Sequence, residues 1–523
     1  MSKIMSVDQA LELIQDGSVV AFSGFLLSGY AEQISASIEK KYLSEGHPKD
    51  LTLIHAAGQG NWAGRGNEHF AHEGLTKRVI GGHFGTCKKM GDLISDNKME
   101  GYNLPQGVIA SMLRNAINGK PGELSKVGLK TYIDPRLEGG KLNEITKKDL
   151  VEVVNFLGEE WLYYRTIKLD VGIIRGTCAD ANGNVSLEEE ISALDMALVA
   201  KAAKCSGGKV IVQVKHIAEE NTLTSSRIDI PGIFIDAVVL CDDPANSHMQ
   251  TGGAFYDQTL SGKLRVPTSG IKRTPLTEKK VIARRAAMEL IPGAVVNLGV
   301  GAPEMVSQVV AEEGLDSKVI MTAESGPIGG IPCGGLSFGA SQNSQGTVSQ
   351  MDQFDFYDGG GLDVTYLGLA QADKVGNINV SKFGKSITGC GGFINISQNT
   401  KKVVYVGTFT AGGLECKFEN GSIKIEKEGK AKKFVEQVMQ VTYSGEYGAE
   451  INQDVLYITE RGVFKLVKGG LELIEIAPGV DLQKDILDQM EFKPFISNNL
   501  KMMPSCIFDE PNIGLENFWR IIE

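Results

Sequence analysis

The chain contains two related copies of one sequence pattern, and this repeat constrains its fold more than any other feature. Residues 170–187, DVGIIRGTCADANGNVSL, match residues 363–380, DVTYLGLAQADKVGNINV, in a strand-like apolar run, an Ala-Asp pair and a Gly-Asn pair. The separation of 193 positions recurs between KVIVQV at 209 and KVVYVG at 402. Self-similarity at a fixed spacing indicates a duplicated structural unit.

The starts of the two halves also correspond. A helix-like segment leads into SVVAFSGF at 18 and into AVVNLGVGAP at 294. This separation is larger, so the first half carries about 83 additional residues, which are expected to include the charged, irregular region 114–165. Glycine and proline in TSGIKRTPLT are typical of a linker. We therefore expect an N-terminal half at 1–267, a linker at 268–277 and a C-terminal half at 278–523.

Short β-branched runs alternate with helix-length amphipathic segments in each half. This alternation predicts an α/β protein made of two related open α/β domains with mostly parallel sheets. Ligands bind such sheets at the carboxyl ends of the strands. The glycines that follow the first strand of each half, SGF and GVGAP, are therefore candidates for a binding site as well as for tight turns.

Charge and composition exclude several classes of partner. The net charge of −11 argues against nucleic acid and against an anionic membrane surface. No apolar run approaches the length of a membrane span, and the N-terminus has no segment of signal type. The eight cysteines form no CxxC pair and histidine is sparse, so we expect no metal site. Few, scattered cysteines indicate reduced thiols, and we expect a cytoplasmic protein.

The segment MTAESGPIGGIPCGG at 321–335 places one carboxylate, Glu324, among small and apolar residues. A dinucleotide or phosphate loop is disfavoured because GVGAPE at 299–304 does not complete GxGxxG. Cys333 and Cys390 lie beside glycines, but a thiol nucleophile needs a base, and no histidine is near either in sequence. Small buried thiols are the simpler interpretation of both.

Glu324 itself has two interpretations that spacing alone does not separate. It is either a turn or cap carboxylate, or a nucleophile that becomes reactive in a dry pocket without a cation. A carboxylate nucleophile requires an activated acyl group such as a thioester. The developing oxyanion then requires close backbone N–H groups, which glycine and alanine permit. Two loops offer them, GVGAP at 299–303 and GCGGF at 389–393.

These motifs together resemble the class I CoA-transferases over essentially the whole chain. ESGPIGG at 324–330 is similar to the family's E-x-G-x-x-G motif, GVGAP to its G-x-G-x-P oxyanion loop and GCGGF to its G-x-G-G-F motif. DGSVVAFSGFLLSGYA resembles the first-half signature, with departures at Ser23 and Ala31. The single-chain acetate/propionate branch fits best, since Ser-Gly follows the glutamate where the ketoacid branch has Asn-Gly.

The resemblance implies an active site between the halves and ping-pong exchange of coenzyme A between a short-chain acyl-CoA and a short-chain carboxylate. Coenzyme A is then a substrate, with no further cofactor and no metal. Homo-oligomers, dimers or tetramers, are expected. An acyl-CoA hydrolase on the same scaffold remains the alternative, and a non-catalytic sensing module is a third reading.

Site residues follow from the same resemblance. Glu324 is the expected nucleophile. The residues expected at the oxyanion and coenzyme A are Gly299, Gly301, Ala302, Gly389, Gly391 and Gly392. The apolar pocket is expected from Gly326, Pro327, Ile328, Ile331 and Phe393. The segment GGHFGT at 81–86 is a weaker candidate for the pocket wall, because His83 is equally well explained as a structural histidine.

Overall fold

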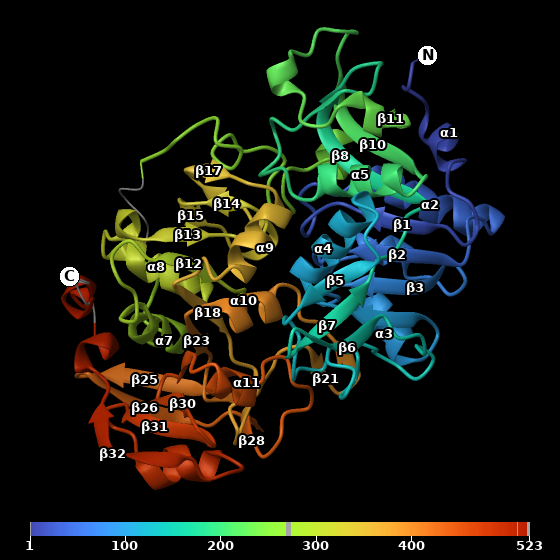
Figure 1. Cartoon of the computed structure of the whole chain (residues 1–523). Coiled ribbons are helices and arrows are strands. Elements are labelled where there is room, and N and C mark those ends of the chain that lie inside the picture. Colours follow the sequence, from blue (N-terminus) through green and yellow to red (C-terminus); the bar gives the residue numbers. More distant parts are fainter. Residues whose placement is uncertain (1, 268–272, 510, 520–523) are drawn as a thin grey trace.

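The chain forms two lobes that lie side by side, one from each half of the sequence (Figure 1). The computed structural model describes residues 2–267, 273–509 and 511–519. Half of the expected linker, 268–272, lies outside the described residues, and the boundaries at 267 and 278 stay a prediction. Within the described ranges, no helix has both the length and the apolar character needed to cross a membrane.

The sheet of the first lobe is parallel except for one short strand. Its order is β11-β10-β8-β1-β2-β3-β4, every neighbouring pair is parallel, and β9 pairs antiparallel with β8. The bounds are β1 Val19–Phe22, β2 Leu51–His55, β3 Thr76–Gly81, β4 Glu100–Asn103, β8 Val171–Ala179, β9 Val185–Ser186, β10 Lys209–Ile217 and β11 Ala237–Leu240.

The sheet of the second lobe has a parallel centre and mixed edges. Its order is β17-β14-β13-β12-β18-β23-β29-β30-β31-β32, and the strands from β13 to β29 are parallel. The bounds are β12 Val295–Leu298, β13 Ile320–Thr322, β14 Pro327–Ile328, β17 Gly346–Thr347, β18 Val364–Gly368, β23 Lys402–Val406, β29 Asp454–Ile458, β30 Gly462–Val467, β31 Gly470–Ile476 and β32 Phe495–Met502.

The order of the strands confirms the duplication. The series β11-β10-β8-β1-β2 in the first sheet corresponds to β29-β23-β18-β12-β13 in the second. The matched segments at 170 and 363 form β8 and β18, and those at 209 and 402 form β10 and β23. The two related open α/β units with mostly parallel sheets are therefore confirmed.

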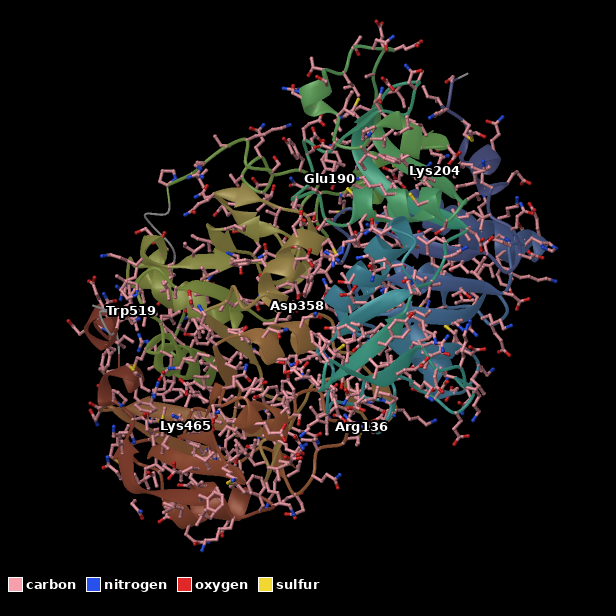
Figure 2. The ribbon with its side chains drawn as sticks, viewed as in Figure 1. Arg136, Glu190, Lys204, Asp358, Lys465 and Trp519 are labelled. Carbon is pink, nitrogen blue, oxygen red and sulfur yellow. The ribbon has the colours of Figure 1, made fainter. Side chains whose placement is uncertain are left out.

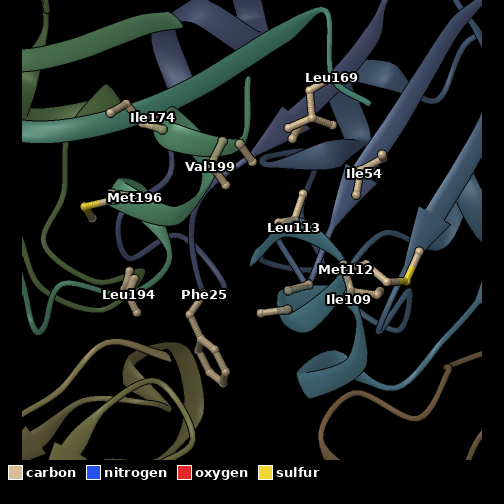
Figure 3. Close-up of a cluster of buried hydrophobic side chains, with 14 of the residues drawn as sticks. Phe25, Ile54, Ile109, Met112, Leu113, Leu169, Ile174, Leu194, Met196 and Val199 are labelled. Carbon is tan, nitrogen blue, oxygen red and sulfur yellow. The ribbon is translucent and has the colours of Figure 1, made fainter. Parts of the chain in front are cut away.

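Helices cover both faces of each sheet, because the parallel strands alternate apolar side chains between two cores. On β8, Ile173 packs with the helices α1 to α3 and Ile174 packs with α4 and α5. Figure 3 shows the second of these cores, in which Leu113 of α4 and Val199 of α5 lie near Ile54 and Ile174. The bounds are α1 Val7–Leu11, α2 Glu32–Glu45, α3 Lys88–Ser95, α4 Gln106–Ile117 and α5 Met196–Cys205.

In the second lobe, α7 and α8 cover one face of the sheet, and α9 and α10 cover the other. The bounds are α7 Glu278–Ala287, α8 Glu304–Glu312, α9 Gln350–Asp358 and α10 Phe393–Asn399. Two shorter helices lie outside these layers: α6 Pro244–Ser247 in the first half of the chain and α11 Gly445–Glu450 in the second. The layers place α9 and α10 beside α4 of the first lobe (Figure 1).

The lobes are joined by a polar network at this helix junction. The Asn395 side chain accepts the Gly107 N–H at 3.1 Å and donates to Asp358 at 3.0 Å. Figure 2 shows Asp358 at the boundary between the lobes, where burial raises the pKa of its carboxyl to about 7. The core of the first lobe extends across the junction to Cys390 and Ile394, so the two lobes share packed surface.

The additional segment of the first half is more regular than the sequence suggested. Strands β5 Gly122–Ser125, β6 Val151–Phe156 and β7 Glu159–Arg165 form an antiparallel sheet of order β5-β7-β6. The expectation of an irregular region is wrong for these residues. Leu162 and Tyr164 alternate as buried positions on β7, but the charged residues at both ends of the strand obscure that alternation.

Candidate active site

A cavity of about 670 Å³ lies between the two lobes. Its walls come from both halves of the chain. The first lobe contributes Phe25, Leu26, Gly58, Trp62, His83, Gly85, Thr86 and Gln106. The second contributes Asn297, Leu298, Gly299, Val300, Gly301, Glu304, Glu324, Gly335, Phe338, Leu367, Gly368, Val380, Thr388, Gly389, Cys390, Gly391, Gly392, Phe393 and Ile396.

The topology of the sheets explains why these segments meet. Gly299 follows β12, Glu324 follows β13 and Gly368 ends β18, and these three strands are parallel neighbours. Their carboxyl ends therefore lie at one edge of the second sheet. In the first lobe, Phe25 and His83 follow the parallel strands β1 and β3 in the same way.

Glu324 is the carboxylate expected to react, and its surroundings leave the charge uncompensated. Its side chain is half-buried and lines the cavity. Among the residues that the structure describes, none donates a hydrogen bond to this carboxylate or pairs with it as a cation. Removal from water raises the pKa of Glu324 from 4.5 to about 7, since burial disfavours the charged form.

The loop 389–392 packs directly against this carboxylate. A Cβ atom on Gly392 would lie 2.1 Å from Glu324 Oε2, so only glycine allows the backbone this close. The first lobe fixes the loop: Gly391 N–H donates to Gly82 O at 2.6 Å, and Cys390 N–H donates to Asn103 Oδ1 at 3.0 Å. Gly391 has a φ of 51°, a conformation that glycine adopts without strain.

The loop 299–303 is divided between two cavities. Gly299 and Gly301 line the cavity of Glu324, but Ala302 lines a smaller neighbouring cavity. The Gly301 N–H donates to Glu304 Oε1 at 3.0 Å, so this amide already has a partner in the structure. Burial also raises the pKa of the Glu304 carboxyl.

The expected apolar pocket is only partly present. Phe393 lines the cavity, whereas Gly326, Ile328, Pro327 and Ile331 are absent from its wall. Gly326 closes a turn instead: its N–H donates to Ala323 O at 2.9 Å, and a Cβ there would lie 2.1 Å from Val348 O. The turn returns the chain antiparallel along β13, which directs Ile328 into the sheet.

The two cysteines offer a poor alternative to Glu324. Cys390 lines the cavity, but burial raises the pKa of its thiol to about 12. Burial also raises the pKa of the Cys333 thiol, which is outside the cavity wall. Both thiols are therefore protonated at neutral pH, and the thiolate is the nucleophilic form. His83 does line the cavity, and burial lowers its pKa to about 4, so the ring is neutral there.

Several residues of the cavity wall were not predicted from the sequence. Phe25 belongs to SGF, which was a candidate for a binding site only through its glycine, and Trp62, Asn297 and Phe338 stand in none of the motifs expected at the site. Gln106 is the first residue of α4 and is buried, and within the described ranges its Nε2 group has no hydrogen-bond partner. A free amide donor in a cavity wall is available to a bound acid or ester.

Comparisons with known proteins identify the class of enzyme. The sequence profile of the family named Coenzyme A transferase matches residues 4–240. The chain is similar to a caffeate CoA-transferase from Acetobacterium woodii, with 48% identity over 521 residues and 99% of each chain covered. It is also similar to the acetate CoA-transferase YdiF from Escherichia coli, with 42% identity over 514 residues, 98% of this chain and 96% of the relative.

Comparison with solved structures identifies the same class of enzyme. A crystal structure of acyl-CoA transferase YdiF from E. coli O157:H7, in a thioester complex with CoA, matches with a TM-score of 0.92 and 41% identity. The match covers 98% of this chain and 97% of that one. The chain belongs to the coenzyme A transferase family, as its motifs indicated, and CoA-transferase is its enzyme class.

Proposed function

We propose that the protein transfers coenzyme A between a short-chain acyl-CoA and a free short-chain carboxylate of the propionate, acetate or lactate type, through intermediates bound to Glu324. One observation carries this proposal: Glu324 lines the cavity between the lobes without a cation or hydrogen bond among the described residues. The other carboxylate of the wall, Glu304, accepts the Gly301 N–H. Glu324 is thus the carboxylate free to react.

The reaction proceeds by two exchanges at the same side chain. A Glu324 oxygen attacks the thioester carbonyl, and the C–S bond breaks. Coenzyme A leaves as a thiolate, and the acyl group stays on the enzyme as an acyl-glutamyl anhydride. The thiolate attacks the glutamyl carbonyl, which releases the donor acid and forms a glutamyl-CoA thioester. The acceptor carboxylate then repeats the steps in reverse. One thioester and one acid are exchanged for another pair, so no ATP is required.

The walls of the cavity match the needs of these steps. Either intermediate would hydrolyse in water, and the aromatic side chains of Phe25, Phe338 and Phe393 limit the access of water to the cavity. Each attack creates an oxyanion, which requires hydrogen-bond donors. In the loop 389–393 the N–H groups of Cys390 and Gly391 already donate to the first lobe, so the Gly392 N–H is the candidate donor there. The Gly301 amide would first have to leave Glu304. Gln106 Nε2 is a further donor.

The range of acids is open to direct measurement. The two relatives are named for caffeate and for acetate, which differ greatly in size. We expect short chains to be the preferred substrates, and a panel of acceptors from acetate to caffeate with one acyl-CoA donor measures the preference. On the family resemblance we also propose a homo-oligomer, a dimer or tetramer. A cytoplasmic location stays a prediction.

One experiment distinguishes the transferase from a hydrolase on the same scaffold. Propionyl-CoA is incubated with the protein in the presence and absence of acetate, and the products are separated. We expect acetyl-CoA to form at the rate at which propionyl-CoA disappears, and only a small loss of thioester without acetate. Equal loss of thioester in both samples, with release of free coenzyme A, would overturn the transferase proposal in favour of hydrolysis.

A further inference from the structure

One aromatic side chain of the cavity wall, Trp62, is largely exposed to solvent. It lines the cavity of Glu324, yet 55% of it is exposed. Val300 of the opposite lobe lines the same cavity and is 59% exposed. Residues that line a cavity and also face solvent lie at its mouth. The mouth is therefore bordered by apolar side chains from both lobes, although tryptophan is a residue type that is usually buried.

Elsewhere in the same wall, aromatic side chains contact each other across the lobes. The ring centroids of Phe25 and Phe338 are 5.8 Å apart, and Phe25 is buried. Among the residues that the structure describes, the Trp62 ring has no such ring contact, and its Nε1 group donates no hydrogen bond. The wall is thus closed by an aromatic contact at Phe25 and open to solvent at Trp62.

The loop that carries Trp62 is fixed at its base and exposed at its tip. Gly60 and Gly66 form an isolated β-bridge, which closes residues 61–65 into a short excursion. The Gly66 N–H also donates to Glu32 Oε2 at 3.0 Å. Trp62 and the two residues after it are exposed, and Trp62 has a φ of 61°. This backbone conformation is disfavoured for a bulky side chain, and such positions cluster at functional sites.

The chemistry at Glu324 requires protection from water at this mouth. Attack of water on the glutamyl-CoA thioester would break the C–S bond and regenerate the carboxylate, with one proton of the water going to the sulfur and the other to solvent. Attack on the anhydride would give two carboxylates and two protons. Water is present in large excess over any acceptor acid, so the choice of an acid as acceptor depends on how dry the cavity is.

We propose that Trp62 closes over the mouth of the cavity when coenzyme A is bound to Glu324, and that this closure makes an acid, and not water, the acceptor. The inference rests on the proposed function, since it takes the intermediates to form on Glu324. The Trp62 N–H donates to Thr86 O at 3.2 Å, so the indole would move by rotation about its side-chain bonds while the backbone stays in place. Contact of the indole with Val300 and the ligand would remove apolar surface from water, which stabilises the closed state.

The first test measures how each turnover ends. Propionyl-CoA and acetate are incubated with the native protein, Trp62→Ala, Trp62→Phe and the control Leu157→Ala, and the ratio of free coenzyme A to acetyl-CoA is measured. Leu157 is a matched control because it is also exposed, has a φ of 54° and is outside the cavity wall. We expect the ratio to rise by at least about 10-fold in Trp62→Ala and by less in Trp62→Phe. Leu157→Ala should equal the native protein.

Fluorescence tests the closure itself. Propionyl-CoA is added without an acceptor, and the emission of the native protein is compared with that of Trp62→Phe. Native emission should shift to shorter wavelength as the indole of Trp62 leaves water. Trp62→Phe should show no shift, because Trp161 and Trp519, the two tryptophans that remain, are not in the cavity wall.

Three results would overturn the inference. An unchanged product ratio in a folded Trp62→Ala variant would show that Trp62 does not exclude water. An equal fall of both products would mean that the side chain only supports binding or the fold, which thermal unfolding of the variant would separate. An emission shift of native size in Trp62→Phe would show that Trp62 does not close. Failure of the proposed function is distinct, because the native protein would then form no acetyl-CoA from propionyl-CoA and acetate.

Discussion

At the scale of single residues, the reactivity of Glu324 comes from missing partners. A carboxylate in water is a weak nucleophile because hydration stabilises its charge. Here the side chain has lost part of that hydration, and the described residues offer no cation in exchange. A raised pKa is the equilibrium sign of the same effect, because it measures how much less stable the anion has become. Perturbed carboxyl groups of this kind cluster at catalytic sites.

Replacement of the nucleophile is the simplest prediction at this scale. Glu324→Gln keeps the shape of the side chain but cannot form an anhydride, so the rate of transfer should fall by on the order of 10³-fold or more. The fold should persist, since no ion pair is lost. Cys333→Ser and Cys390→Ser are the matched controls and should keep most of the activity. A Glu324→Gln variant that retains a tenth of the native rate would show that another group attacks the thioester.

The pKa of Glu324 predicts the dependence of the rate on pH. Attack requires the deprotonated carboxylate, and burial raises its pKa to about 7. In the free enzyme kcat/KM for the acyl-CoA donor should therefore be constant above pH 7 and fall tenfold per unit below it. An ordinary glutamate would place the break near 4.5. Initial rates between pH 5 and 9, with unfolding checked at each pH, measure the break.

A profile that is flat from pH 5 to 8 would contradict the assignment of this pKa to the reacting group. A rate that rises throughout the alkaline range would indicate a thiol instead, since burial raises the pKa of Cys390 to about 12.

At the scale of loops and strands, the glycines act through the space that they leave. The loop 389–392 is fixed to the first lobe by hydrogen bonds to Gly82 and Asn103, and its backbone at Gly392 lies directly against the Glu324 carboxylate. This arrangement makes the position of the carboxylate depend on contacts between the lobes. A small change in the loop should therefore affect catalysis before it affects folding.

Gly392→Ala tests this dependence. The new Cβ would lie 2.1 Å from Glu324 Oε2, so the carboxylate or the loop must move, and we expect transfer to fall by at least about 10²-fold. Gly346→Ala is the control, because nothing lies within 4 Å of a Cβ there. Activity and unfolding temperature are measured for both. If Gly392→Ala is as active as Gly346→Ala, close contact between the loop and the carboxylate is not required.

Elements were predicted where one local pattern determines them. The site was predicted mainly on the side of the second lobe, although His83, Gly85 and Thr86 of the weaker candidate GGHFGT also line the cavity. β-branched runs and the repeat gave the parallel strands and their duplication, and glycine clusters gave the loops near Glu324. Sequence does not say which way a loop residue points. Ala302 therefore falls in the neighbouring cavity, and Ile328 is turned away by the hairpin after β13.

Part of the wall formed by the first lobe was missed for a different reason. Phe25, Trp62 and Gln106 reach the cavity only because the two lobes pack together. That packing depends on contacts between residues hundreds of positions apart, such as Gly107 with Asn395. No local pattern around any of these residues encodes the contact, whereas Glu324 and its glycines are adjacent in sequence.

At the scale of the whole molecule, the cavity requires both lobes. Walls from each half enclose it, and the core of the first lobe includes Cys390 and Ile394 of the second. Residues 1–267 and 278–523, expressed as separate chains, should be inactive alone and should regain activity when produced together and purified as a complex. The intact chain is the reference. Substantial transfer by residues 278–523 alone would show that the first lobe is not part of the active site.

The most direct test of the account is to identify the side chain that carries coenzyme A. The protein is mixed with propionyl-CoA in the absence of an acceptor, denatured rapidly and digested, and its peptides are weighed by mass spectrometry. The account predicts that the peptide containing Glu324 gains the mass of coenzyme A less one water. An adduct on Cys333 or Cys390, or no adduct on any peptide while transfer proceeds, would contradict it.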